Sequence, residues 1–545
     1  MNRISVRRRL ALGLGASALL VSMVAGPALA ANVVVLAITG SGLTASVADL
    51  TLTSVAYQNA AHDVTGTMVL TADDSTGSGA GWNVTIVASE FVWVGTANGG
   101  INIPAANFAL TSAAAPTLIA GQVVSATAAT GPQVPPLSPL GTLNTARKTL
   151  SATAAYGAGT YSQDLGVTLT IPAQSRVGVY TGTVTTTITS APWRLSSGVR
   201  QADRRRGPRL ASLGLFCIFL GLAAPVAALA NGPQIKLALQ AVGQSGSFFD
   251  LTMRPGQTRR LDVEISNAGT AAIAARTYAS DVYTIIDGGF GARLRDEAQT
   301  GVTRWLDYRT DVLALSIGEA VRRTFQVAVP ANAAPGEYIT SLVLENDDPI
   351  RDSGPVALDQ IVRQAVAVVI TVPGTRSPAL AVGGVKHSVV AGRSVVAVAV
   401  ENSGNVRLKP VATFSLRDAA GVEVSQVTVP MDTFYARTRT SIEVPLAELL
   451  LPGTYTVRLS LDDTRQGVRA DGAGSFTVET LPAGSTGGGD SAPGLVPVIR
   501  AGQEGPPPFA AGLGIIVGTG LALVAVIGFA SLVLRRRRAT RTSDR

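Results

Sequence analysis

A chain of 545 residues can hold about three or four domains of ordinary size. Its formal net charge of +8 does not indicate nucleic-acid binding, because fifteen arginines lie in three runs beside apolar stretches. Without these arginines and the two aspartates among them, the rest of the chain has a net charge of −5. The folded parts are therefore mildly acidic, which excludes a phosphate-binding surface. Only 15% of residues are charged and 5% aromatic, which is typical of β-rich extracellular modules.

The first thirty residues have the layout of a secretory signal peptide. A basic start precedes an apolar stretch from Leu10 to Val24, and Ala28-Leu29-Ala30 stands before Ala31. Small residues at these positions fit signal peptidase, so we expect cleavage after Ala30. An uncleaved anchor helix is the alternative. Either reading predicts export of the chain that follows.

Residues 31–192 are predicted to form one all-β domain. Short alternating or apolar runs are separated by clusters of Gly, Ser, Asp and Pro, and the clearest run is 177–190, where threonines alternate with other residues. The pair Gly99-Gly100 lacks the spacing and the following helix of a nucleotide-binding loop, which favours a turn between strands.

Residues 199–230 repeat the plan of the N-terminus inside the chain. Arg204-Arg205-Arg206 precedes an apolar stretch, and Ala228-Leu229-Ala230 stands before Asn231, so a second cleavage after Ala230 is expected. A membrane helix here would place residues 231–508 in the cytoplasm and the C-terminal arginines outside, against the positive-inside rule. We therefore favour two neighbouring reading frames fused into one, with a joining membrane helix as the alternative.

Residues 235–373 and 377–480 are predicted to be two immunoglobulin-like β-sandwiches related by a loose internal repeat. Each has a strand that ends in an Asn-x-Gly turn and later a Pro-Gly-x-Tyr step that leads into another strand. A tyrosine at such a corner lays its ring on the core while its hydroxyl ties the loop. The two copies of these features are Asn267 with Tyr338, and Asn402 with Tyr455.

The C-terminal part is predicted to be a stalk followed by a membrane anchor. Residues 481–508 are rich in Gly, Ser and Pro, as flexible linkers are. Residues 509–534 carry no charge, and as a helix they would extend about 39 Å, enough to span a bilayer. The basic tail, 535–545, is expected to stay cytoplasmic, which leaves the preceding chain at the cell surface.

The sequence contains no motif for catalysis or for a cofactor. His62 and His387 are the only histidines and have no cysteine nearby, which disfavours a zinc site. Neither a phosphate-binding loop nor a Gly-x-Ser-x-Gly elbow occurs. The acidic run 345–348 and the pair Asp462-Asp463 have oxygen ligands that calcium accepts, although solvated turns explain both. We expect a protein that binds and is not an enzyme.

Four aromatic residues are candidates for ligand binding. Trp82 and Trp93 offer flat faces that suit the C–H face of a sugar, and filling the sandwich core is an equally good explanation of both. Trp305 and Tyr308 follow a turn and form a second candidate pair with the same alternative.

Residues 31–192 resemble a WxL domain, a cell-wall-binding module of Gram-positive bacteria. The resemblance rests on Gly81-Trp82-Asn83-Val84-Thr85-Ile86 and on the closing stretch 178–192. The first tripeptide is Trp-Asn-Val, with Val84 where the family has Leu, and Thr186 stands where the second Trp is usual. The resemblance implies a role in peptidoglycan binding for Trp82 alone of the two motif tryptophans.

Residues 235–480 are similar to WxL-interacting proteins, in which a DUF916-type peptidoglycan-binding module precedes a second, host-binding module. The matching stretches are 248–251, 255–258, Val329-Pro330 and Pro335-Gly336. The resemblance implies WxL-type surface proteins and peptidoglycan as partners. We therefore expect a non-catalytic adhesion or scaffold assembly at the cell wall. A membrane-tethered accessory or chaperone-like subunit that presents other exported proteins is the alternative.

Overall fold

The structure, a computed structural model, covers most of the three β-rich parts of the chain. The residues that it describes are 42–48, 52, 56–124, 131–137, 140–190, 235–244, 246–351 and 356–479. The expected cleavage sites after Ala30 and Ala230, the internal apolar segment 199–230, and everything from the stalk 481–508 onward lie outside these residues. Within the described ranges, no helix is long and apolar enough to cross a membrane.

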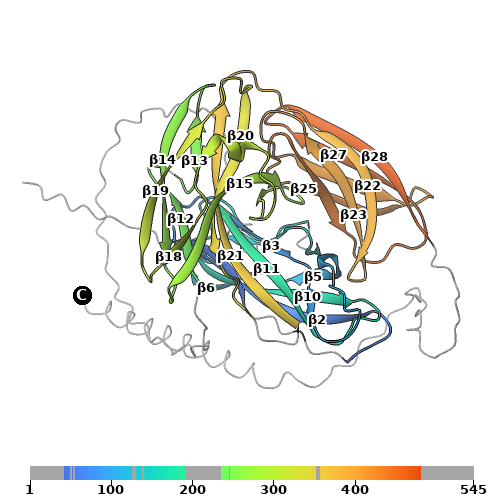
Figure 1. Cartoon of the computed structure of the whole chain (residues 1–545). Helices are drawn as coiled ribbons and strands as arrows, with labels where there is room; N and C mark the ends of the chain where they lie inside the picture. Colours follow the sequence, from blue (N-terminus) through green and yellow to red (C-terminus); the bar gives the residue numbers. More distant parts are fainter. Residues whose placement is uncertain are drawn as a thin grey trace, which may run out of the picture. The chain divides into compact units, whose positions relative to one another are not determined.

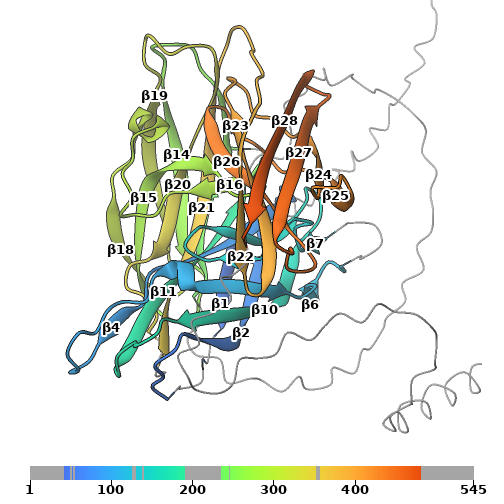
Figure 2. The ribbon, with the colours of Figure 1, turned by 90° about the vertical axis from the view of Figure 1, so that its right-hand side faces the viewer.

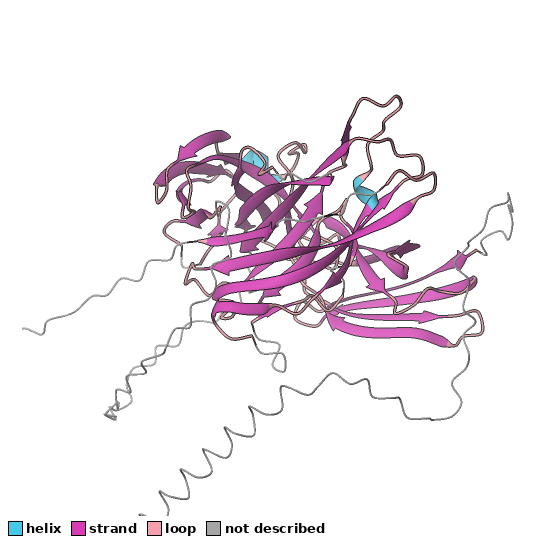
Figure 3. Cartoon of the chain, turned by 90° about the horizontal axis from the view of Figure 1, so that it is seen from below, coloured by secondary structure: helices cyan, strands magenta, loops and turns pink. Residues whose placement is uncertain are grey.

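Nearly all regular structure is β-strand (Figure 3). The only helical elements in the described part of the chain are two 3-10 turns, η1 (Ala105–Asn107) and η2 (Val302–Trp305). Many strands alternate buried and exposed side chains, as β27 (Gly453–Asp463) does, which is the pattern of a sheet with one face in a core. The predicted all-β class with sandwich-like sheets is confirmed for the described residues.

The N-terminal module consists of strands β1 to β11 (Figure 1). One sheet has the order β1-β2-β10-β5-β8 with β6 on β10, and the other runs β11-β3-β9-β7 with β4 on β11. Side chains from both sheets, among them Met68, Ile86 and Leu165, form one fully buried cluster. The bounds are β1 Leu43–Ala48, β2 His62–Asp74, β3 Trp82–Ala88, β4 Val92–Val94, β5 Phe108–Ala113, β6 Thr117–Gly121, β7 Pro132–Gln133, β8 Gly141–Thr142, β9 Arg147–Ala152, β10 Gly159–Ile171 and β11 Val179–Ser190.

The middle module consists of strands β12 to β21. One sheet has the order β12-β14-β19-β17, and the other runs β16-β15-β20-β21 with β18 on β15 and β13 on β21. Phe249 and Phe325 meet edge to face in its core, with ring centroids 5.2 Å apart. The bounds are β12 Leu237–Ala241, β13 Phe249–Thr252, β14 Thr258–Asn267, β15 Ile273–Thr284, β16 Phe290–Ala292, β17 Leu306–Asp307, β18 Asp311–Leu315, β19 Ala320–Ala328, β20 Gly336–Asn346 and β21 Val356–Val372.

The third module consists of strands β22 to β28 in two sheets. Their orders are β22-β23-β26 and β25-β24-β27-β28. Val398, Phe414 and Leu459 belong to a core cluster that draws side chains from both sheets. The bounds of the remaining strands are β22 Ala381–Val390, β23 Arg393–Asn402, β24 Val411–Arg417, β25 Glu423–Pro430, β26 Thr438–Pro445 and β28 Val468–Val478.

The two predicted Asn-x-Gly turns make matching hydrogen bonds. Asn267 accepts a bond from the N–H of Gly269 at 2.9 Å and donates to two carbonyls. Asn402 does the same, accepting from the N–H of Gly404 at 3.0 Å. Both side chains are buried, so each satisfies the backbone of a turn that would otherwise lack partners.

The tyrosine corners are also present, and there is a third that the sequence reasoning missed. Tyr338 and Tyr455 each donate to the carbonyl four residues earlier, at 2.8 Å in both cases. Tyr180 makes the same bond to Arg176 in the N-terminal module, also at 2.8 Å. The shared signal is Gly-x-Tyr at the start of a strand, since Gly178 precedes Tyr180 as Gly336 precedes Tyr338.

Candidate functional site

Strand β21 belongs to the sheets of two modules. Its first part pairs in parallel with β11, from Tyr180 opposite Val356 to Ser190 opposite Val366. Its second part pairs antiparallel with β20 of the middle module, and β13 runs parallel to it on the other side. The result is one sheet of eleven strands that crosses from the N-terminal module into the middle module (Figure 1 and Figure 2).

The composition of β21 suits this position. Parallel strands are normally buried on both faces and read as continuous apolar runs, and residues 365–370 are such a run. Val366 and Val368 are fully buried within the core cluster of the middle module. Leu358, nearer the start of the strand, is 3% exposed and packs in the core cluster of the N-terminal module. One strand therefore supplies side chains to two cores.

A buried arginine fixes the middle of β21. Arg363 donates hydrogen bonds to the carbonyls of Ala292 and Arg293 and forms an ion pair with Glu345, its Nε lying 3.4 Å from Oε2. Burial raises the pKa of the Glu345 carboxyl, and the guanidinium of Arg363 opposes that shift. A guanidinium this deeply buried is tolerated only where carbonyls and a carboxylate surround it.

Two ion pairs join the N-terminal module to the third module. The Arg147 guanidinium lies 2.5 Å from the Glu443 carboxylate, and the Lys148 ammonium lies 2.9 Å from the Asp432 carboxylate. Lys409 approaches the other oxygen of Asp432 at 3.6 Å. Burial by itself would raise the pKa of Asp432, but the ammonium groups of Lys148 and Lys409 outweigh it and hold the pKa below its usual range.

A loop of the middle module reaches the same place. Asp287 donates its backbone N–H to the Ser441 carbonyl at 3.0 Å and accepts the N–H of Glu443 at 2.8 Å. The Lys148 ammonium donates to the carbonyl of Gly288 at 3.0 Å, so this lysine contacts both other modules. Burial raises the pKa of the Asp287 carboxyl to about 7. The junction of the three modules is therefore a network of buried polar groups.

The structure places Trp82 and Val84 in the core, which is the alternative that the sequence left open. Trp82 is 1% exposed, its indole N–H donates to the Gly157 carbonyl at 3.0 Å, and its ring lies 6.3 Å from that of Tyr161. Val84 is fully buried in the same cluster. Neither side chain reaches the surface, where a wall polymer would bind.

Trp93 lies in β4, near the end of a hairpin that projects from the N-terminal module (Figure 2). Its ring is half-buried and fits against glycines, since a Cβ on Gly100 would come within 2.3 Å of the indole and one on Gly178 within 2.4 Å. Its neighbours Val92 and Val94 are exposed. This is the only one of the two N-terminal tryptophans with any surface available to a ligand.

Trp305 and Tyr308 are half-buried against the core of the middle module and have separate partners. The ring of Trp305 lies 4.5 Å from that of Tyr338, and the ring of Tyr308 lies 5.8 Å from that of Phe325. The Tyr308 hydroxyl is 2.6 Å from that of Thr277. These contacts give both aromatic rings a structural role in the module.

The junction residues were missed by the sequence reasoning, although one signal was present. The chain has only four lysines, Lys148, Lys236, Lys386 and Lys409. Lys148 pairs with Asp432 across modules, and Lys236 of the middle module lies 3.6 Å from Asp73 of the N-terminal module. Two of the four lysines thus lie at contacts between modules. No group of three acidic, histidine or cysteine side chains suited to a metal occurs among the described residues.

No family model and no curated protein matches the sequence. Solved structures with which the chain shares some likeness include three bacterial chaperones. The Escherichia coli chaperone DraB is 13% identical over 45% of this chain and 97% of its own, with a TM-score of 0.19. The Pseudomonas aeruginosa CupB2 chaperone is 12% identical over 44% of this chain and 100% of its own, with a TM-score of 0.17. The class 5 fimbriae chaperone CfaA is 12% identical over 41% of this chain and 92% of its own, with a TM-score of 0.18. Likeness at this level carries no argument about function.

Proposed function

We propose that the chain is a non-catalytic cell-surface assembly that binds the peptidoglycan wall, in which a WxL-like N-terminal module is held by a WxL-interacting-protein-like middle module. The observation that carries the proposal is β21, a strand of the middle module that pairs with β11 and places Leu358 in the N-terminal core. Strand addition of this kind takes affinity from main-chain bonds and specificity from the side chains it inserts. The link to the wall comes from the resemblance of the two halves to wall-binding families, and not from Trp82, whose side chain is buried.

The same pairing suits two neighbouring gene products joined in one frame. If each of the two products loses its own signal segment, residues 1–30 and 199–230, neither mature polypeptide contains cysteine, since Cys217 lies within the second segment. Their association would then be non-covalent and would rest on the strand ladder, on Leu358 and on the buried ion pairs. The apolar segment 509–534 would anchor the assembly to the plasma membrane.

The proposal is tested by expressing residues 31–192 and 231–508 separately and titrating one into the other. We expect heat release and co-elution at micromolar concentration, in low salt and in high salt, because main-chain pairing and apolar burial are not screened as exposed charges are. Intact native material that runs from Ala31 through the membrane segment would contradict the two-product form. Absence of association would contradict the proposal itself.

A second function, a chaperone-like accessory subunit that presents other exported proteins, is favoured by the same strand addition. The two functions predict different binding partners. A scaffold at the wall should sediment with purified peptidoglycan, whereas an accessory subunit should retain protein partners only. Sedimentation of the full chain with purified walls that have been freed of protein distinguishes the two functions.

A further inference from the structure

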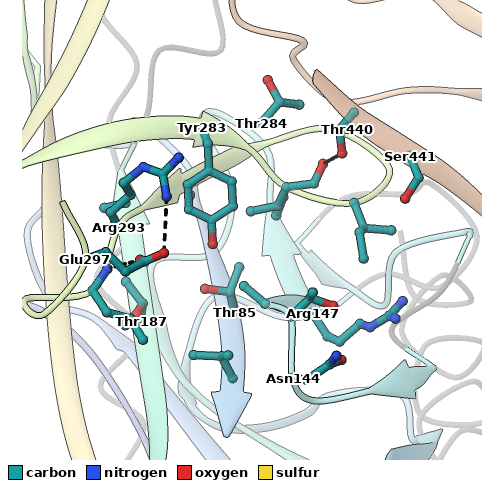
Figure 4. A pocket seen from close by; sticks show the side chains of 18 of the residues that line it. Thr85, Asn144, Arg147, Thr187, Tyr283, Thr284, Arg293, Glu297, Thr440 and Ser441 are labelled. Atoms are coloured by element: carbon teal, nitrogen blue, oxygen red, sulfur yellow. Dashed lines mark hydrogen bonds and ion pairs between the residues drawn. The ribbon is translucent and has the colours of Figure 1, made fainter. Parts of the chain in front are cut away.

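A cavity of about 680 Å³ lies where the three modules meet. This volume is within the range of small-molecule sites. The N-terminal module contributes Thr85 and Thr187, the middle module Tyr283 and Arg293, and the third module Ser441 (Figure 4). The cavity is complete only when all three modules are assembled.

The charged groups that line the cavity are already neutralised. Each of its four arginines has a carboxylate partner. The pairs are Arg147 with Glu443 at 2.5 Å, Arg293 with Glu297 at 3.2 Å, Arg363 with Glu345 at 3.4 Å and Arg439 with Glu401 at 2.9 Å. The pairs of Arg147 and Arg363 are buried, so a phosphate or carboxylate ligand would have to break a buried pair to reach either guanidinium. The inner lining therefore favours a ligand without net charge.

The uncharged polar groups of the lining have unused bonding capacity. Thr85 and Thr187 stand directly opposite each other on β3 and β11, and each is 5% exposed. Within the part of the chain that the structure describes, neither hydroxyl takes a hydrogen bond, and neither do those of Tyr283 and Ser441. Burial raises the pKa of the Tyr283 phenol, which keeps it protonated and able to donate.

We propose that this junction cavity binds a short neutral oligosaccharide. Sugar hydroxyls both donate and accept, which matches the free hydroxyls of Thr85, Thr187 and Ser441. Tyr283 contributes its hydroxyl, since the guanidinium of Arg293 lies over its ring, 5.9 Å from the centroid. The inference deepens the proposed function, because it assigns a glycan to one cavity. It rests on the proposed function in one respect, that the three modules are assembled.

The test uses the full chain in detergent micelles and isothermal titration calorimetry with three probes: chitotriose, maltotriose and a sulfated heparin disaccharide. We expect at least one neutral probe to bind and the sulfated one not to bind. Thr187→Val and Ser441→Ala each remove one hydroxyl with little change of shape, and each should weaken binding roughly three- to tenfold. Thr456→Val, at an exposed position on β27, is the matched control and should bind like the unaltered chain.

Three results would overturn the inference. They are a folded chain that binds neither neutral probe at millimolar concentration, binding of the sulfated probe alone, and binding that neither cavity variant weakens. Thermal melting of each variant shows that it is folded. If the chain still sediments with peptidoglycan while no soluble probe binds, the proposed function survives and this inference fails.

Discussion

The ammonium of Lys148 lies 2.9 Å from the carboxylate of Asp432, across 284 positions of the chain and between two modules. Both side chains are largely buried, so each charge depends on the other for the solvation that it has lost. Lys409 is the only other ammonium near this carboxylate among the ion pairs of the described residues.

Lys148→Met is therefore expected to destabilise the folded chain by about 3–5 kcal/mol, because it removes the nearer of the two ammonium groups that pair with a buried carboxylate. The measurement is the urea dependence of unfolding, followed by tryptophan fluorescence. Arg417→Met is the matched control: it breaks the exposed pair with Glu423, and should cost less than about 1 kcal/mol. An equal loss of unfolding free energy in the two variants would show that the buried junction pair stabilises the chain no more than an exposed pair does.

Asp287 is expected to make the junction sensitive to pH. Its carboxyl faces Glu443, Lys148 and Arg147, and burial raises its pKa to about 7 from 3.8. The folded chain thus holds this proton more tightly than the unfolded chain. The contribution of this proton to the free energy of unfolding is fully present below about pH 4 and is lost as the pH rises to 7.

Asp287→Asn removes this titration. It keeps an oxygen for the N–H of Glu443, and asparagine tolerates the positive φ of 61° at this position. Relative to the unaltered chain, the variant should be about as stable at pH 4.5 and more stable by on the order of 2–4 kcal/mol at pH 8. Thermal unfolding at both pH values measures the difference. A difference that does not vary with pH would contradict the assignment.

Trp82→Ala is expected to cost roughly 3–5 kcal/mol, because the side chain is buried and its N–H is bonded to Gly157. Trp93→Ala should cost less, since that ring is half-buried on a projecting hairpin. Melting curves measure the stability of each variant, and sedimentation with peptidoglycan measures its wall binding. A Trp82→Ala chain that stays folded and only loses wall binding would overturn the core assignment.

Leu358→Ala should weaken the association of the two halves by at least about 30-fold, because removing a buried leucine costs roughly 2–5 kcal/mol. The effect is measured by titrating residues 31–192 with residues 231–508 that carry the substitution. Asp359→Ala, at the next position and therefore on the opposite face of β21, serves as the control. If both variants bind alike, the inserted leucine does not carry the contact.

The sequence was sufficient for features that depend on local chemistry. The Asn-x-Gly turns at Asn267 and Asn402 and the corners at Tyr338 and Tyr455 are set by residues a few positions apart, and their hydrogen bonds are as expected. The corner at Tyr180 was within reach of the same reasoning, because Gly178 precedes it as the other glycines precede their tyrosines.

The features that join modules were not predictable in this way. An apolar strand such as β21 indicates burial on both faces but does not say which distant strand lies beside it. The pairing of Lys148 with Asp432 likewise follows from the packing of modules and from no local pattern. Trp82 was ambiguous because a tryptophan on an alternating strand suits a core and a sugar-binding face equally well.

The sharing of β21 sets an order of events during synthesis. The edge of β11 is complete by residue 190, but its parallel partner begins only at Val356, so the N-terminal sheet must wait with an open edge while the intervening chain is made. Long-range parallel pairing of this kind forms slowly, and an unpaired edge is prone to aggregation in the meantime. The yield of correctly folded protein should therefore depend on how soon the second half becomes available to pair with the first.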